Sequence, residues 1–184
     1  GWESKIGGQS MFFGTTMWGL SMVSTNDGWA VGENVRDGTL KGQIYRWDGQ
    51  RWSPAPSPDQ RVYAIDMLSG TDGWLAGKGG LLQRWNGTAG TTWPASPTEQ
   101  DIWAVDMRTA NDGWAVGDGG AILRWNGSTW AKAASGLTST MLRGVSILSA
   151  VGGARGWAVG DKGEVYRLAA GTWTAGSSPT GNDL

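Results

Sequence analysis

The sequence of 184 residues contains no cysteine and no histidine. Without cysteine it can form neither disulfides nor thiolate metal sites. Without histidine it lacks the usual general base near neutral pH and the imidazole metal ligand. The glutamates form no recognisable pair of the kind that glycosidases use; those considered are Glu3, Glu33, Glu99 and Glu164. We therefore expect a protein that is not an enzyme and has no metal and no cofactor.

Charge of one sign and long apolar runs are also missing. The chain has 15 basic and 16 acidic residues, a net charge of −1, and no block of like charges. Counterion release would add little to nucleic-acid binding, so we expect no nucleic-acid partner. No apolar run approaches the roughly 18 residues that span a bilayer, so the sequence predicts no membrane-spanning segment.

Glycine and tryptophan are abundant, with 32 and 14 copies, which is typical of short strands joined by tight turns. The sequence NDGWAVG at 111–117 recurs at 26–32, as TDGWLAG at 71–77 and as a shortened RGWAVG at 155–160. The tryptophans of these copies are 40 to 45 residues apart. A period of this length indicates four copies of one supersecondary unit.

Two further signals keep the same period. Arg-Trp-Asp/Asn-Gly occurs at 46–49, 84–87 and 124–127, with a weaker Arg-Leu at 167–168. Another tryptophan follows in each copy: Trp52, Trp93, Trp130 and Trp173. Three signals in phase show that the whole unit repeats, not only one motif.

The third copy predicts four short strands, over 102–108, 113–117, 121–125 and 128–132. Turn residues separate them, and Asn126-Gly127 predicts a type I′ hairpin turn because both residues tolerate positive φ. Four antiparallel strands per unit of about 40 residues, with no helical period, are typical of a β-propeller blade. We predict an all-β propeller with about four blades in this chain.

The predicted boundaries are an N-terminal segment at 1–15 with a possible closing strand, then blades and a short tail at 16–184. The blades cover about 16–60, 61–100, 101–140 and 141–179. In each blade small residues alternate with large ones, so that the bulky face of one sheet can pack on the shallow face of the next.

Two recurrent charged positions have structural and functional interpretations. The aspartates of Asp-Gly-Trp are expected to hold a turn, with a ligand role as the alternative; they are Asp27, Asp72 and Asp112. The arginines of the third strands are expected to tie one blade to its neighbour through Asp66 and Asp106. They are Arg46, Arg84, Arg124 and Arg167. The alternative is a ring of arginines for an anionic ligand.

The pattern [N/T]-D-G-W-A-V-G, a glycine turn, R-W-[N/D]-G and a later tryptophan resembles the repeat of photosystem II assembly and stability factors. This repeat family is related to the BNR, sialidase-like propellers, but the chain lacks the full Asp-box signature. The resemblance covers nearly the whole chain. It implies a non-enzymatic scaffold, often extracytoplasmic or lumenal, that works by protein contact.

Propellers of this type usually have about seven blades, so four blades predict a sector of a larger ring. We expect a second copy or another protein to complete the ring, because an open arc exposes apolar end faces. The segment 1–5 resembles a fourth strand without a blade of its own; it is expected to belong to a preceding blade or one in another chain, or to pair with the last blade as a closing strand. Phe12 and Phe13 are expected to be buried as a plug, with docking of a partner as the alternative.

Specificity should lie where the copies differ. The connection between the second and third strands of the first blade is swollen, at 33–41. In a propeller such connections share one face with the blade linkers, which predicts a mixed-charge contact face. Its expected members are Glu33, Arg36, Asp37, Lys41, Lys78, Asp118, Asp161 and Lys162.

We expect a protein-interaction scaffold, as an accessory or assembly subunit of a larger complex. A carbohydrate-binding propeller is the alternative. It predicts that Trp18, Trp103 or the third-strand tryptophans are solvent-accessible in equivalent pockets, and burial of these residues between blades would contradict it.

Overall fold

The computed structural model describes residues 15–91, 96–134, 136–148 and 153–177, which form four antiparallel sheets of four strands each. The first sheet contains β1 (Thr15–Ser24), β2 (Asp27–Arg36), β3 (Thr39–Trp47) and β4 (Trp52–Ala55). The second contains β5 (Val62–Ser69), β6 (Asp72–Gly77), β7 (Leu82–Trp85) and β8 (Gly90–Thr91). The third contains β9 (Ile102–Thr109), β10 (Asp112–Gly117), β11 (Ile122–Trp125) and β12 (Trp130–Ala134). The fourth contains β13 (Leu142–Leu148), β14 (Arg155–Gly160), β15 (Val165–Ala169) and β16 (Thr172–Ala175).

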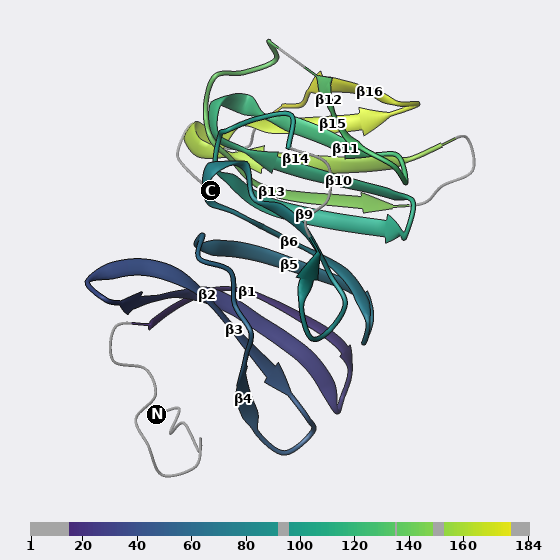
Figure 1. Ribbon diagram of the computed structural model, residues 1–184. Helices are drawn as coiled ribbons and strands as arrows, with labels where there is room; N and C mark the ends of the chain where they lie inside the picture. Colours follow the sequence, from purple (N-terminus) through teal and green to yellow (C-terminus); the bar gives the residue numbers. More distant parts are fainter. Residues whose placement is uncertain (1–14, 92–95, 135, 149–152, 178–184) are drawn as a thin grey trace.

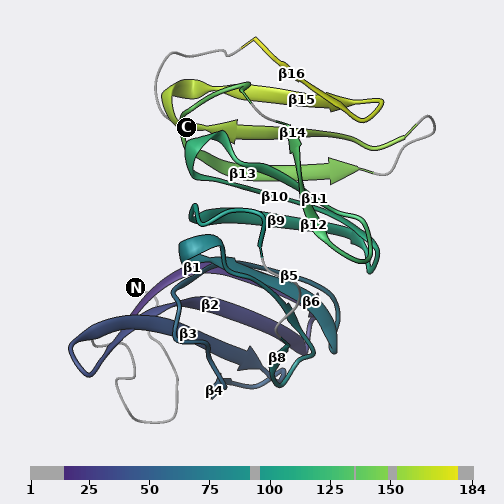
Figure 2. The same ribbon diagram turned by 45° about the horizontal axis from the view of Figure 1, so that its top comes forward.

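The sheets are stacked face to face in chain order, with the first and fourth at opposite ends of the stack (Figure 1). Their first strands β1, β5, β9 and β13 are neighbours in that order, and the view in Figure 2 shows the same succession. The predicted β-propeller fold of four-stranded blades is therefore confirmed. The expected closing strand at 1–5 and plug at Phe12 and Phe13 lie outside the described residues.

Each boundary between sheets is filled by one apolar cluster built from both sides. The tryptophan of each of the first three Gly-Trp motifs points into the cluster shared with the following sheet. Trp29, Trp74 and Trp114 are buried there, with at most 1% of their surface exposed. Indole packing thus joins the repeats, as the alternation of large and small residues predicts.

Three of the recurrent arginines form ion pairs with aspartates of their own sheets, so the prediction that Asp66 and Asp106 are their partners is wrong. Arg84 pairs instead with Asp72 of its own sheet, through two hydrogen bonds of 2.7 and 3.1 Å. The same pair joins Arg46 to Asp27 at 3.2 Å in the first sheet. β2 and β3, or β6 and β7, place the two side chains on adjacent strands, within reach of each other.

The arginine also covers the tryptophan beside it. The guanidinium carbon of Arg46 lies 5.2 Å from the centre of the Trp29 ring, directly across the strand pair. A cation over an indole face adds to the packing of the sheet. The aspartates that were expected to hold turns are therefore partners of these arginines.

Aspartate side chains on the first, innermost strands of the second and third sheets accept hydrogen bonds from backbone N–H groups of the next sheet. Asp66 Oδ2 accepts from the backbone N–H of Met107 at 2.6 Å. Asp106 accepts in the same way from Ile147 at 2.5 Å. Burial raises the pKa of both carboxyl groups. These aspartates tie neighbouring sheets together without an arginine.

In the first three blades the third hairpin is present where Asp/Asn-Gly predicted it, but the turn is not type I′. Only the glycine has positive φ, for example 88° at Gly87. The Asn86 side chain accepts hydrogen bonds from the backbone N–H groups of Thr88 and Ala89, at 3.0 and 2.8 Å. The side chain of the first residue therefore holds a longer turn.

The swollen segment 33–41 is not a loop. β2 and β3 continue through it as a long hairpin that closes at Asp37-Gly38, where both residues have positive φ. This is the two-residue Asp-Gly turn that favours a type I′ conformation.

Candidate functional site

The four innermost strands β1, β5, β9 and β13 each contain a small residue, glycine or alanine, near the start of the strand. The large residues directly before these small ones form a cluster of three aromatic rings and one arginine. We call it the axial cluster; its members are Trp18, Tyr63, Trp103 and Arg143. Tyr63 and Trp103 are stacked, with ring centres 4.2 Å apart and 11° between their planes. Trp18 meets both rings edge-on, at 6.1 and 6.2 Å. The first three sheets thus contribute three contacting rings.

The fourth sheet contributes a cation. Arg143 places its guanidinium carbon 5.9 Å from the centre of the Trp103 ring, and its side chain is exposed. It also forms an ion pair with Asp161. A cation against an indole face is a favourable arrangement. Arg143 therefore takes the place in the fourth sheet that an aromatic ring takes in the other three.

Carboxylates hold the polar ends of the cluster. The Tyr63 hydroxyl donates to Asp101 Oδ2 at 3.1 Å, and Trp103 Nε1 donates to Asp118 Oδ1 at 2.8 Å. Burial, followed by the negative charge of Asp101, raises the pKa of Tyr63, so its hydroxyl remains a donor. These two hydrogen bonds therefore hold the Tyr63 and Trp103 rings in their orientations.

Four members of the expected contact face belong to the long β2–β3 hairpin. Glu33 is 7% exposed and pairs with Arg61 at 3.3 Å. Arg36 donates to the carbonyl oxygen of Gly42 at 2.7 Å. Lys41 forms an exposed ion pair with Asp59 at 2.9 Å, and Asp37 occupies the hairpin turn.

The other four members lie in short 3-10 turns between the second and third strands of the later blades. They are Lys78 in η1 (Lys78–Gly80), Asp118 in η2 (Asp118–Gly120), and Asp161 and Lys162 in η3 (Asp161–Gly163). Each turn donates a backbone N–H to the segment just before an innermost strand, for example from Asp118 to the Asp101 carbonyl at 2.9 Å. The turns therefore lie beside the starts of the innermost strands.

The structure brings part of the expected set to the axial cluster. Asp118 and Asp161 contact Trp103 and Arg143 directly. Lys78 instead lines a shallow pocket with Asp59 and with Leu40, which lies near the tip of the long hairpin. The role of these residues in binding stays a prediction.

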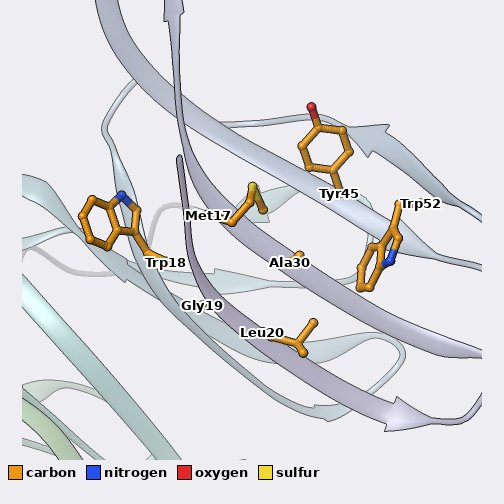
Figure 3. A pocket seen from close by; sticks show the side chains of 7 residues that line it. All are labelled: Met17, Trp18, Gly19, Leu20, Ala30, Tyr45 and Trp52. Carbon is orange, nitrogen blue, oxygen red and sulfur yellow. The ribbon is translucent and has the colours of Figure 1, made fainter. Parts of the chain in front are cut away.

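The outer face of the first sheet has an apolar pocket of about 400 Å³. Figure 3 shows Leu20, Ala30, Tyr45 and Trp52 spread across this face, with Trp18 at the far side of the pocket. Leu20 is 60% exposed. Among the described residues, the pocket is lined by the strands of the first sheet alone.

The axial cluster suits binding better than bond-making chemistry. Its groups are indoles, a phenol, a guanidinium and carboxylates already engaged in hydrogen bonds.

Within the described ranges, no group of three or more acidic residues is placed to hold a metal ion. The same ranges contain no helix with the length and apolarity to cross a membrane.

The axial cluster was not predicted, although the sequence contains a signal for it. The residues before Gly19, Ala64 and Ala104 are aromatic, whereas the one before Gly144 is arginine. The small residues themselves were noted as a packing feature. A comparison of the position before them across the four copies would have identified the cluster.

Comparison with known proteins shows the fold. No family model matches the chain, and no curated protein matches it. YCF48 bound to D1 peptide superimposes with a TM-score of 0.63 at 19% identity, covering 88% of this chain and 55% of that chain. YCF48 from Cyanidioschyzon merolae gives 0.57 at 20% identity, covering 90% and 57%. Sqt1 from Chaetomium thermophilum gives 0.56 at 10% identity, covering 92% and 63%.

At these identities the similarity concerns the backbone architecture. The chain spans between 55% and 63% of the length of these three propellers. Its four sheets therefore share the β-propeller fold of the YCF48 structures, in agreement with the repeat pattern of its sequence.

Proposed function

We propose that this chain is a non-enzymatic interaction scaffold that binds a segment of a partner protein at the axial cluster. The observation that carries the proposal is the combination of Arg143 with Trp103 and Trp18 at one site. Trp18 is 49% exposed, Trp103 is half-buried, and Arg143 is exposed.

Tryptophan, tyrosine and arginine are the residues that most often dominate the energy of protein interfaces. In the axial cluster all three types meet, and hydrogen bonds to Asp101 and Asp118 restrict the rings. A partner would therefore lose little entropy in ordering the site. The propeller similarity supports the same function, since the YCF48 structure holds a D1 peptide.

A role as an accessory or assembly subunit fits this function, because the fold presents a rigid site and the chain supplies no catalytic histidine or cysteine. We propose a location outside the cytoplasm, because the repeat resembles that of proteins that are often extracytoplasmic or lumenal. Cell fractionation of the native host would test that location.

The carbohydrate alternative predicted exposed tryptophans in equivalent pockets. The third-strand residues Trp85 and Trp125 are instead buried between sheets, at 1% and 0% exposure. Trp18 and Trp157 are each 49% exposed, and Trp18 also belongs to the axial cluster. We propose protein binding as the function and keep carbohydrate binding as the alternative that the following experiment tests.

A displayed library of random peptides, selected on the purified chain, would test the proposal. We expect the selected peptides to bind Arg143→Ala and Trp103→Ala at least about tenfold more weakly, a loss of roughly 1.4 kcal/mol or more. Arg51→Ala is the matched control, because Arg51 is an exposed arginine in the β3–β4 hairpin. Peptides that bind all variants equally, or a chain that binds only glycans on an array, would contradict the proposal.

A further inference from the structure

The two end faces of the stack expose residues whose counterparts are buried at every internal boundary. Trp157 is the fourth-sheet counterpart of Trp29, Trp74 and Trp114, yet it is 49% exposed while they are at most 1% exposed. At the other end, Met22 is 45% exposed, whereas its counterpart Met107 is 5% exposed. Each end face is thus one half of the boundary that the chain forms three times.

The first sheet carries the receiving half, an indole socket. In the third sheet the rings of Trp125 and Trp130 are 5.8 Å apart at 40°, and they hold the ring of Trp74 from the preceding sheet at 4.7 and 5.3 Å. In the first sheet, Trp47 and Trp52 are 5.5 Å apart at 42°. The socket geometry is therefore conserved between the two sheets.

In both sheets the third-strand tryptophan of the socket donates the same kind of hydrogen bond to a backbone carbonyl. Trp125 Nε1 donates to the Ala110 carbonyl at 3.0 Å, and Trp47 Nε1 donates to the Thr25 carbonyl at 3.0 Å. Within the described residues, no preceding sheet inserts an indole between Trp47 and Trp52. Trp52 instead lines the open pocket shown in Figure 3.

The fourth sheet carries the inserting half. Trp157 is covered on one side by Arg167, at 6.0 Å, as Trp29 is by Arg46. Its surroundings form a second open pocket of about 430 Å³, lined in part by Leu148, which is 71% exposed.

Polar groups match as well. At the first internal boundary, Ser21 accepts a hydrogen bond from the backbone N–H of Met67 at 3.0 Å. Ser146 occupies the position of Ser21 in the fourth sheet, and it is exposed. Met22, whose backbone N–H would be the donor, occupies the position of Met67 in the first sheet.

We propose that a second copy of this chain covers these faces, with the fourth sheet of each copy packed on the first sheet of the other. Trp157 of one copy inserts between Trp47 and Trp52 of its partner copy, and Ser146 accepts from the backbone N–H of Met22. Two such contacts close a ring of eight sheets, so neither end remains open. The inference does not depend on the axial cluster.

A second copy is the occupant because the chain itself supplies both halves of the contact, residue for residue. The faces are apolar at their centres, and the net charge of −1 opposes association only weakly. Burial of large exposed side chains such as Leu20, Trp157 and Leu148 then drives the pairing.

Native mass spectrometry and sedimentation over a range of concentrations test the stoichiometry. We expect a species of twice 19.5 kDa. Trp157→Glu and Trp52→Glu should each raise the dimer dissociation constant at least about tenfold. Val35→Glu should leave it unchanged, since Val35 is 53% exposed but lies on the long hairpin, outside both end faces. A monomer at every concentration, or open-ended polymers, would overturn the proposal.

Cross-linking tests the orientation without touching the socket, because the chain has no cysteine of its own. Ser146→Cys and Met22→Cys chains are purified separately, mixed, and treated with a short bismaleimide. We expect a cross-linked dimer only in the mixture. Cross-links within either single-variant sample, or none in the mixture while circular dichroism shows both chains folded, would refute the head-to-tail arrangement.

Discussion

The carboxylate of Asp66 accepts a hydrogen bond of 2.6 Å from the backbone N–H of Met107, across the boundary between the second and third sheets. The residues are 41 positions apart, one repeat of the sequence. Asp106 and Ile147 repeat the contact one blade later. Successive sheets are thus held in register by polar as well as apolar contacts.

Replacing Asp66 by alanine should lower the free energy of unfolding by about 1–3 kcal/mol, because the Met107 N–H would lose its partner in a partly buried place. Asp66→Asn retains an acceptor oxygen and should lose less. Urea unfolding of the two variants, followed by tryptophan fluorescence, measures the difference. Equal losses for both would show that the hydrogen bond is not what the aspartate contributes.

The same aspartates predict a pH dependence. Burial raises the pKa of Asp66 and Asp106 above 3.8 in the folded chain, so ionisation costs more in the folded state than in the unfolded one. Relative to an Asp66→Asn, Asp106→Asn double variant, the wild type should be most stable below the ordinary aspartate pKa. Its relative stability should fall as the pH rises through the raised pKa. Unfolding curves collected from acid to neutral pH test the sign, and a relative stability that increases with pH would contradict it.

Glu164 should behave in the opposite way. Its Oε2 accepts hydrogen bonds from the hydroxyls of Thr138, at 2.6 Å, of Thr140 and of Tyr166, at 3.1 Å. The first two are the main cause of its lowered pKa. The stabilisation is present above the unfolded pKa of about 4.3 and is lost as the pH falls through the lowered folded pKa.

Glu164→Gln should therefore be less stable than the wild type at neutral pH and equal to it in strong acid, as measured by denaturant unfolding. Glu99→Gln, at an exposed linker position, is the matched control and should show no such trend. A deficit that persists unchanged in acid would indicate a packing defect instead of a lost carboxylate.

Arg84→Lys should destabilise the chain by about 1 kcal/mol, because a lysine cannot form the two parallel hydrogen bonds that Arg84 donates to Asp72. Arg167→Lys is the control. Arg167 is the fourth-blade counterpart of Arg84, but the position of Asp72 is occupied there by Arg155, so the equivalent ion pair cannot form. Thermal unfolding of both variants checks the contrast. If both lose the same stability, the ion pair is not the reason for the arginine.

The architecture could be predicted because its signals are local. Asn111 to Gly117 and its copies gave the period, and the turn residues between them delimited four strands per unit, as the structure confirms. Details within turns were less accessible. At Asn86-Gly87 the sequence predicted the hairpin, but the asparagine side chain decided the turn type by its hydrogen bonds.

Partners from different repeats could not be predicted. Asp66 and Asp106 were assigned to arginines because opposite charges at matching positions are plausible partners. The structure gives those arginines to Asp27, Asp72 and Asp112, which lie on adjacent strands of the same sheet. The choice depended on which strands are neighbours and on the faces that their side chains occupy.

By itself, the sequence of this protein determined the repeat, the all-β class and the alternation of large and small residues, because strand period and turn chemistry operate over a few neighbouring residues. Only the stacking of the sheets decided that Trp18, Tyr63, Trp103 and Arg143 meet. It also decided that Trp157 is exposed while its three counterparts are buried. Side chains about 40 residues apart come together only when one sheet lies on the next, and an end sheet has no such neighbour within the described chain.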